Sequence, residues 1–326
     1  MHNSKYLLSI CIPTYNRASI IRDCVDSCLE INSKNIEIVV TDNASTDGTY
    51  NELKDIKDSR FKYFRNNQSI GYENIVRCIL NSSGKYALVI SDEDKICDLD
   101  LELLKKELSI EQASLFRADY YEIDGTLEMV HPHDYLKANY SSDIYRYILN
   151  HVGRICGMVF KVDDLRRIYD EIDKSTMIWK LYPHVVASMY MALHGDFSKI
   201  TSFKVKAFHQ IDVDLNSCKV DTDNLYFFPE GRYKITRDWI RLFAEFPLSD
   251  EIKGEILSAI VKRYRSLVLS LKDVFADDHF IKSFGPTMEN KMLEYRNYTW
   301  YQWQLLSSKY EYQLWEYVDE MYGRNE

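Results

Sequence analysis

Residues 86–94 read Tyr-Ala-Leu-Val-Ile-Ser-Asp-Glu-Asp, an apolar run that ends in three adjacent acids. Five apolar or aromatic residues that follow Gly84 predict a fully buried strand. Such a strand would deliver Asp92, Glu93 and Asp94 to its carboxyl end, where open α/β sheets bind ligands. Adjacent carboxylates repel one another unless a cation neutralises them, and a hard divalent cation prefers oxygen ligands. The stretch therefore indicates either a metal and phosphate site or an acidic turn that caps the next helix.

Apolar strand-like segments alternate with helical patterns through the first hundred residues. We expect strands at 7–12, 36–41 and 61–65, separated by segments with apolar residues at helical spacing. Parallel strands need a crossover connection, which is usually a helix, so this alternation predicts a parallel, doubly wound sheet. The last third of the sequence is helical in periodicity throughout. We therefore expect an α/β domain over residues 1–224 and a helical domain over residues 225–326.

Composition and charge narrow the class of protein. The chain has 326 residues, of which 46% are hydrophobic, and this is enough for a full core. Its net charge of -9 argues against nucleic acid as a partner, because binding to the phosphate backbone needs a basic face. The seven cysteines are spread along apolar runs and are expected to be reduced core residues. No stretch reaches the length of a membrane span, so a cytoplasmic location is expected.

Four motifs in a fixed order carry a family resemblance. They are SICIPTYNR at 9–17, VVTDNASTDGT at 39–49, NQSIGYEN at 67–74, and the central strand with its acids at 84–94. Each motif alone is weak, but the ordered set resembles glycosyltransferase family 2, the inverting transferases with the GT-A fold. The resemblance is to members that build bacterial polysaccharides. It implies an α/β fold with a mixed GT-A sheet flanked by helices, followed by a helical C-terminal region.

The resemblance also implies where a nucleotide sugar would bind. Asp42, after the second strand, would hydrogen-bond the base or ribose, although capping the following turn is its structural alternative. Gly71 and Asn74 lie where the family brings the chain close to the nucleotide, and Asp92 and Glu93 would contact the sugar or ribose. An aromatic ring can stack on a base and an arginine can pair with a phosphate. The residues implied for those contacts are Pro13, Thr14, Tyr15 and Arg17.

The family holds Mn²⁺ or Mg²⁺ against the diphosphate with an Asp-any-Asp element after this strand. Here Ser91 stands at the first place and Glu93 at the third, so the choice of metal ligand among Asp92, Glu93 and Asp94 stays open. His209 stands where family members often carry a histidine that reaches back to the metal, and it completes the expected ligand set. A metal at this place would neutralise charge on the leaving diphosphate.

An inverting transfer also needs a general base within hydrogen-bond reach of the acceptor hydroxyl. Family members often supply it from a Glu-Asp pair at a helix start, and the sequence has no clear pair of this kind. His184 follows Pro183 at the equivalent helix start and is the first candidate. Asp163 is the second candidate, although it also has the position of a first-turn helix acid.

These features together imply a metal-dependent glycosyltransferase that moves a sugar from a nucleoside diphosphate sugar, most often a UDP-sugar, to a glycan hydroxyl in capsule or O-antigen synthesis. The expected partners are the donor, a glycan or lipid-linked oligosaccharide acceptor, the inner face of the membrane, and a second copy bound through the C-terminal helices. A non-catalytic scaffold that binds nucleotide sugar or glycan stays open, because the acids are altered and the Glu-Asp pair is missing. A nucleotidyltransferase is the other alternative, but the loop at 13–17 lacks the glycine usual in that class.

Overall fold

The computed structural model describes residues 4–121, 127–128, 135–137, 142–153, 155–206, 228–282 and 286–323. The chain forms two compact units. The first comprises Met1–Lys174 and Tyr182–Asp212, and the second comprises Ser175–Leu181 and Val213–Glu326. The domain boundary expected at residue 224 falls outside the described residues and stays a prediction.

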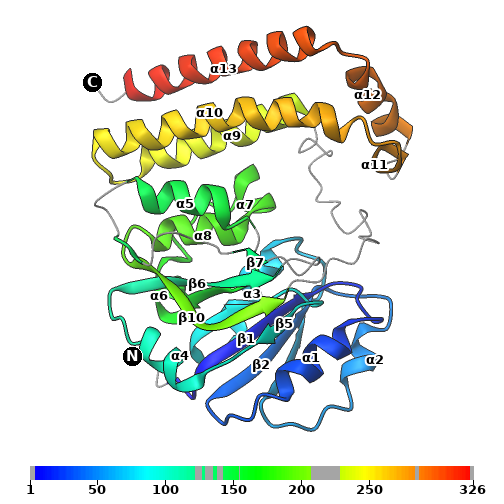
Figure 1. The fold of residues 1–326 in the computed structure, drawn as a ribbon, viewed down its shortest axis with the longest axis vertical. Helices are drawn as coiled ribbons and strands as arrows, with labels where there is room; N and C mark the ends of the chain where they lie inside the picture. The colour runs from blue at the N-terminus through cyan, green and yellow to red at the C-terminus, as the bar shows by residue number, and fades with distance from the viewer. Residues whose placement is uncertain are drawn as a thin grey trace. The chain divides into compact units, whose positions relative to one another are not determined.

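The first unit is built on one mixed sheet (Figure 1). Its strands follow the spatial order β3-β2-β1-β4-β9-β6-β10-β5, with β7 beside β6 and β8 beside β10. Their bounds are β1 Tyr6–Thr14, β2 Ile36–Asp42, β3 Phe61–Arg65, β4 Gly84–Val89, β5 Lys95–Cys97, β6 Ala113–Tyr121, β7 Leu127–Glu128, β8 Tyr135–Leu136, β9 Met158–Lys161 and β10 Asp196–Lys206.

Strands β1 to β4 are parallel neighbours, which confirms the parallel arrangement predicted for the first hundred residues. Strand β9 then runs antiparallel to both β4 and β6, so the complete sheet is mixed, as the family resemblance implied. Because β1 to β4 run in the same direction, their carboxyl ends lie along one edge. This edge carries Thr14, Asp42 and Arg65, and the acidic turn at 91–94 follows it.

Helices flank this sheet. Their bounds are α1 Ile21–Leu29, α2 Thr49–Leu53, α3 Glu73–Asn81, α4 Leu101–Glu107, α5 Asp143–His151, α6 Val162–Ile168 and α8 Pro183–Met191. Helix α4 is capped by Asp100, whose carboxylate accepts the amides of Glu102 and Leu103. The cap of this helix is therefore Asp100, and the acidic turn does not have the capping role that was its structural alternative.

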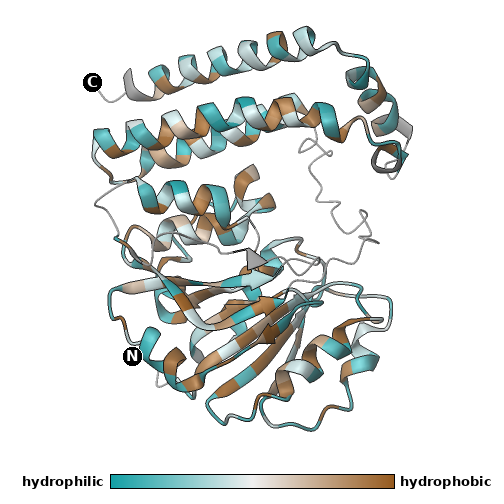
Figure 2. Ribbon diagram, viewed as in Figure 1, coloured by the Kyte–Doolittle hydropathy of each residue, from teal (hydrophilic) through white to brown (hydrophobic). Residues whose placement is uncertain are grey.

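The core of the first unit explains why the strands read as continuous apolar runs. Every residue of β2 is buried, and Ile10, Leu88 and Ile90 are almost fully excluded from solvent. Figure 2 shows hydrophobic residues concentrated along the central strands. A strand covered by helices on both faces cannot alternate with polar residues, so a run without alternation is the expected sequence. Six cysteines of the described residues are free thiols, and five of these are buried, as expected.

The second unit is helical. Its elements are α7 Met177–Leu181, α9 Pro229–Glu245, α10 Asp250–Val274, α11 Asp278–Lys282, α12 Pro286–Arg296 and α13 Trp300–Gly323. The short helix α7 joins this unit through the amide of Met177, which donates to Asp238 of α9 at 2.8 Å. Tyr295, Trp303 and Phe275 pack against one another in its interior. None of the described helices is both long and apolar enough to cross a membrane.

Candidate functional site

Asp92 is held between the last residue of β1 and a residue of the loop that follows this strand. The Thr14 hydroxyl donates to Asp92 Oδ2 at 2.7 Å, and Arg17 Nε lies 3.5 Å from Oδ1. Strands β1 and β4 are parallel neighbours, so the loop after β1 lies next to the turn after β4. The predicted residues Thr14, Arg17 and Asp92 therefore form one cluster at the carboxyl edge of the sheet.

Burial raises the free energy of the charged form of Asp92. The Asp92 side chain is 12% exposed, and burial raises its pKa to about 6. The charge of Arg17 and the hydrogen bond from Thr14 lower this pKa, while the charge of Glu93 raises it. Thr14 and Arg17 therefore compensate only part of the desolvation. A carboxylate that remains under-compensated favours the binding of an additional cation.

Asp94 points into the protein. It is 1% exposed, and its Oδ2 accepts the Ser91 amide at 2.9 Å and the Cys156 thiol at 2.7 Å. Burial, and then the charge of Asp94, raise the pKa of the Cys156 thiol to about 12, so this group stays protonated and donates. The three acids of the turn therefore have different surroundings, because Asp92 faces the β1 loop and Asp94 faces Cys156.

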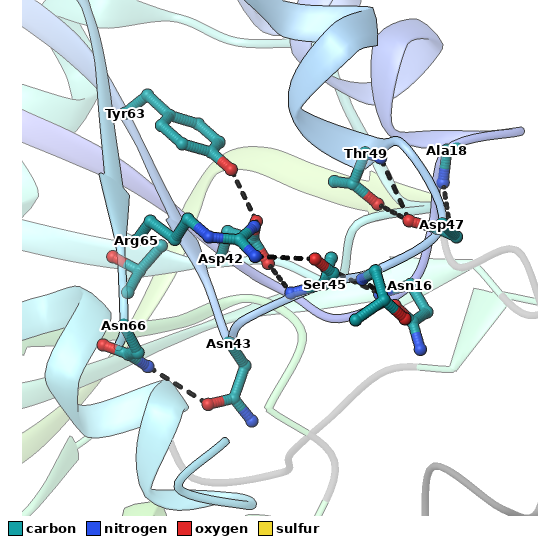
Figure 3. Close-up of polar contacts among 12 residues, drawn as sticks. Asn16, Ala18, Asp42, Asn43, Ser45, Asp47, Thr49, Tyr63, Arg65 and Asn66 are labelled. Carbon is teal, nitrogen blue, oxygen red and sulfur yellow. Dashed lines mark hydrogen bonds and ion pairs between the residues drawn. The ribbon is translucent and has the colours of Figure 1, made fainter. Parts of the chain in front are cut away.

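Asp42 is fully buried and accepts three hydrogen bonds (Figure 3). Its Oδ1 accepts the Ser45 amide at 2.8 Å, and its Oδ2 accepts Tyr63 Oη at 2.5 Å and Arg65 Nη1 at 2.6 Å. Burial and the hydrogen bond to Asp42 raise the pKa of Tyr63, so its hydroxyl stays a donor. Asp42 thus stabilises its own turn, as the structural alternative expected, and is also held by two side chains of β3.

Two loops at this edge bind each other reciprocally. The amide of Asn16 donates to Ser45 Oγ at 2.8 Å, and Asn16 Oδ1 accepts the amide of Thr46 at 2.8 Å. The amide of Ala18 donates to Asp47 Oδ2 at 2.9 Å (Figure 3). Asn16 adopts a φ of 53°, which asparagine tolerates better than most residues. The loop that carries Tyr15 is therefore fixed against the loop after β2, and Pro13 lies within β1 opposite Thr41 of β2.

Asn74 and Gly71 belong to the next connection along this edge. Asn74 is buried, its Nδ2 donates to the Thr41 carbonyl at 2.8 Å, and its Oδ1 accepts Asn66 Nδ2 at 2.9 Å. Gly71 is exposed with a φ of 60°, and its carbonyl accepts Asn43 Nδ2 at 3.2 Å. Asn74 thus has a structural role in holding the loop, and the backbone of Gly71 lies at the surface.

Comparison with known proteins identifies the family. Residues 9–169 match the family model described as Glycosyl transferase family 2. Residues 9–169 therefore form a glycosyltransferase family 2 domain. Among curated proteins, this transferase is 26% identical to abequosyltransferase RfbV of Salmonella typhimurium over 271 residues, 77% of each chain. It is 37% identical over 89 residues to the glucosyltransferase WfaP of Escherichia coli, whose name gives UDP-Glc and a diphosphoundecaprenol-linked GlcNAc. That match covers 27% of this chain and 36% of WfaP.

The fold is shared with solved transferases. The chain matches the structure of Staphylococcus aureus TarS 1–349 in complex with UDP with a TM-score of 0.60 and 14% sequence identity. The match covers 98% of this chain and 92% of the TarS chain. A mannosyltransferase from Pyrobaculum calidifontis, solved with GDP-Man and Mn²⁺, has a TM-score of 0.50 and 13% identity. It covers 98% of this chain and 89% of that one. The expected GT-A sheet with a helical C-terminal region is confirmed.

Of the metal ligands expected for this family 2 transferase, the structure describes the three acids of the turn and not the histidine. Among the described residues, no three His, Cys, Asp or Glu side chains lie close enough together to hold a metal ion. His209 lies outside the described residues. Mg²⁺ is commonly bound by one or two carboxylates together with substrate phosphates. Asp92 and the half-buried Glu93 beside it fit that kind of site.

The two candidates for the general base differ in surroundings. His184 is 4% exposed, and its Nε2 lies 3.3 Å from the carbonyl oxygen of Gly153. A carbonyl only accepts, so Nε2 carries the proton and Nδ1 carries the lone pair. Burial lowers the pKa of His184 to about 4, so the ring is neutral at pH 7. Asp163 is 50% exposed in the first turn of α6 and pairs with Arg166 at 3.5 Å.

Three residues with contacts in this site were not predicted from the sequence. Tyr63 and Arg65 bind Asp42, and Cys156 binds Asp94. The predicted strand at 61–65 contained a signal for the first two, because residues two apart in a strand share a face. No sequence signal indicated Cys156, which is 62 residues from its partner.

Proposed function

We propose that this transferase moves a sugar from a nucleoside diphosphate sugar, with inversion, to a hydroxyl of a bacterial surface glycan. The observation that carries the proposal is the cluster of Asp92, Thr14 and Arg17 at the carboxyl edge of the parallel strands. This cluster combines an under-compensated buried carboxylate with a cationic side chain, a combination suited to a metal-bound diphosphate. A UDP-sugar is the proposed donor, supported by the name of WfaP and the UDP-GlcNAc complex of TarS.

Each described donor-site residue has a proposed role. Asp92 and Glu93 would hold Mn²⁺ or Mg²⁺, and a bound cation neutralises the charge of the leaving diphosphate. Arg17 pairs with a phosphate, and Tyr15 stacks on the base. Asp42 hydrogen-bonds the base or ribose, and the hydrogen bonds that its carboxylate accepts within the protein fix the orientation of this side chain. The acceptor is a glycan or lipid-linked oligosaccharide, as for relatives whose names include a diphosphoundecaprenol.

The test of this proposal is a donor panel measured by thermal shift and by nucleotide-sugar hydrolysis. UDP-, GDP-, CMP- and dTDP-sugars are each added with Mn²⁺ or with a chelator. We expect one nucleotide class to raise the unfolding temperature and to be hydrolysed slowly, and we expect the chelator to abolish both effects. No shift with any donor would contradict the transferase proposal. Binding without turnover would favour the scaffold, and pyrophosphate release from a nucleoside triphosphate and a sugar phosphate would favour the nucleotidyltransferase.

We propose His184 as the general base, with Asp163 as the alternative. The lone pair of His184 Nδ1 is buried and has no hydrogen-bond partner among the described residues. An acceptor hydroxyl that reached it would supply the missing donor, and its proton could then pass to the ring. Asp163, in contrast, already pairs with Arg166.

His184→Gln is expected to lower kcat by about 10³-fold with an unchanged KM for the donor, because removal of a general base costs about 10²–10⁴-fold. Asp163→Asn serves as the matched variant and should keep kcat within about twofold. Steady-state kinetics of both variants, with their unfolding temperatures, make the comparison. The reverse order of effects would assign the base to Asp163 and leave His184 with a packing role.

Two proposals about partners concern the second unit. Peripheral contact with the inner face of the membrane would bring this unit to a lipid-linked acceptor, and a homodimer would form through the same C-terminal helices. Tyr301, Leu305 and Tyr312 are exposed and share one face of α13, opposite the buried Trp303. Exposed apolar side chains on one helix face suit either partner.

A further inference from the structure

The turn that carries the acids is closed by its own third acid. The Asp94 amide donates to the Ser91 carbonyl at 3.1 Å, and the Asp94 carboxylate accepts the Ser91 amide at 2.9 Å. These two hydrogen bonds join the first and last residues of the turn. Glu93 and Asp92 lie between them, so the placement of both depends on Asp94 keeping its position.

Cys156 approaches this turn from the segment before β9. Its thiol donates to Asp94 Oδ2 at 2.7 Å and lies 3.5 Å from Ser91 Oγ. The adjacent Gly157 fixes the approach, because its amide donates to the Val89 carbonyl at 3.2 Å. Gly157 has a φ of 77°, and a Cβ there would lie 3.1 Å from a backbone oxygen of β6. The segment is therefore held tightly between β4 and β6, with the thiol directed at Asp94.

We propose that Cys156 is a positioning residue of the donor site, which acts through Asp94 so that Asp92 and Glu93 face the cation and the diphosphate. The proposal rests on the proposed function, because it assumes that a donor binds at the acidic turn. It assigns Asp94 to the support of the turn and leaves Asp92 and Glu93 as the metal-binding carboxylates.

The proposed role of Cys156 follows from the free-energy cost that a buried carboxylate incurs when it loses a hydrogen-bond donor. Asp94 is almost fully excluded from solvent, so water cannot replace a missing hydrogen bond without opening the turn. Hydrogen bonds to a charged acceptor are stronger than those between neutral groups. Loss of the thiol would therefore release Asp94 and loosen the turn that presents Asp92 and Glu93.

A matched control is available elsewhere in the first unit. Cys78, on α3, is fully buried, and its thiol donates to the Val39 carbonyl at 3.4 Å. Cys78→Ala removes the same atoms from another buried position, where the acceptor of the thiol is a backbone carbonyl of β2 instead of Asp94. Cys156→Ser keeps a donor at the position, whereas Cys156→Ala removes it.

The experiment measures the Kd of UDP, or of the nucleoside diphosphate that the donor panel selects, by calorimetry with Mn²⁺ and with a chelator. We expect Cys156→Ala to weaken Mn²⁺-dependent binding about tenfold and to leave binding in chelator unchanged. The Kd of Cys156→Ser with Mn²⁺ is expected to lie within about threefold of the native value. The Kd of Cys78→Ala should equal the native value. The unfolding temperatures of the two alanine variants should fall by similar amounts, which separates positioning from stability.

Two results would overturn the inference while leaving the proposed function intact. The first is an equal Kd for Cys156→Ala and Cys78→Ala, and the second is an equal loss in Cys156→Ala and Cys156→Ser. Asp94→Asn adds a further check, because nucleotide binding by this variant should retain part of its Mn²⁺ dependence. If Asp94→Asn lost the Mn²⁺ dependence as completely as Asp92→Asn, Asp94 would be a metal ligand. If the native chain shows no Mn²⁺-dependent binding of any nucleotide, both the inference and the proposed function fail.

Discussion

Asp92→Asn is expected to reduce sugar transfer by about 10³-fold, which corresponds to about 4 kcal/mol of transition-state stabilisation. The amide has nearly the same shape and still accepts the Thr14 hydroxyl, but it carries no charge for a cation. Arg17 would lose its partner at the same time. The measurement is kcat and kcat/KM with the donor selected by the panel, at saturating Mn²⁺.

Asp98→Asn is the matched control for this substitution. Asp98 lies just after β5, is exposed, and pairs with Lys204 at 3.8 Å. We expect its activity to stay within about twofold of the native chain. A rate for Asp92→Asn above about a tenth of the native rate would contradict the assignment of Asp92 to the donor site.

The same substitution is expected to stabilise the metal-free fold. The pKa of Asp92 is raised from 3.8 to about 6 in the folded chain, so between these values the folded state binds more protons than the unfolded state. Stability of the native chain therefore falls as pH rises through this window, and the full cost at pH 7 is about 3 kcal/mol. Urea unfolding in chelator at pH 4 and pH 7 should show this loss for the native chain and a smaller one for Asp92→Asn. Equal pH dependence in both chains would contradict it.

Asp42→Ala is expected to lower both the free energy of unfolding and the affinity for the nucleotide. Removal of this buried carboxylate leaves the Tyr63 hydroxyl and the Ser45 amide without their acceptor, and it leaves Arg65 without its ion pair. Breaking a buried pair costs about 3–5 kcal/mol, but Arg65 is partly exposed and can be hydrated. We therefore expect a loss of about 3 kcal/mol in urea unfolding. Nucleotide Kd should rise by at least about 30-fold, because the loop that Asp42 supports also positions the base.

Two further variants define what Asp42 contributes. Tyr63→Phe removes one donor to Asp42 and should cost about 1 kcal/mol. Asp58→Ala removes an acid that pairs with Arg60 outside the site, and a partly exposed pair of this kind contributes about 0–1 kcal/mol. Normal nucleotide binding by Asp42→Ala, together with its lower stability, would show that Asp42 has only a structural role.

The parallel part of the sheet was predictable because its determinants are local. Strands β1, β2 and β4 are buried at most or all of their residues and are largely apolar runs, and helices connect the parallel strands, so sequence periodicity alone indicates this part of the sheet. The pairing of the strands beyond residue 94 was not visible in periodicity, and the mixed sheet came from the family resemblance. Antiparallel insertion of β9 between β4 and β6 depends on pairing between distant segments, which local patterns do not specify.

The candidate site was predictable in its residue types and less so in their contacts. Asp42 ends one buried strand, and Asp92 and Asp94 follow another, but their different surroundings arise from neighbours elsewhere in the chain. The register of β2 against β3 places Arg65 opposite Asp42, and this register is not readable from either strand alone. Asp94 is directed inward by Cys156 from a separate strand region, which explains why the three acids of the turn could not be ranked from sequence.

The reciprocal hydrogen bonds between the loop after β1 and the loop after β2 have a consequence for changing donor choice. Each loop supplies acceptors for the amides of the other, so neither keeps its shape without its counterpart. A graft of residues 13–18 from a relative with another donor would remove bonds that residues 42–49 need. The two segments are therefore expected to be exchangeable only as a pair, and natural diversification of the donor would have to alter them in concert.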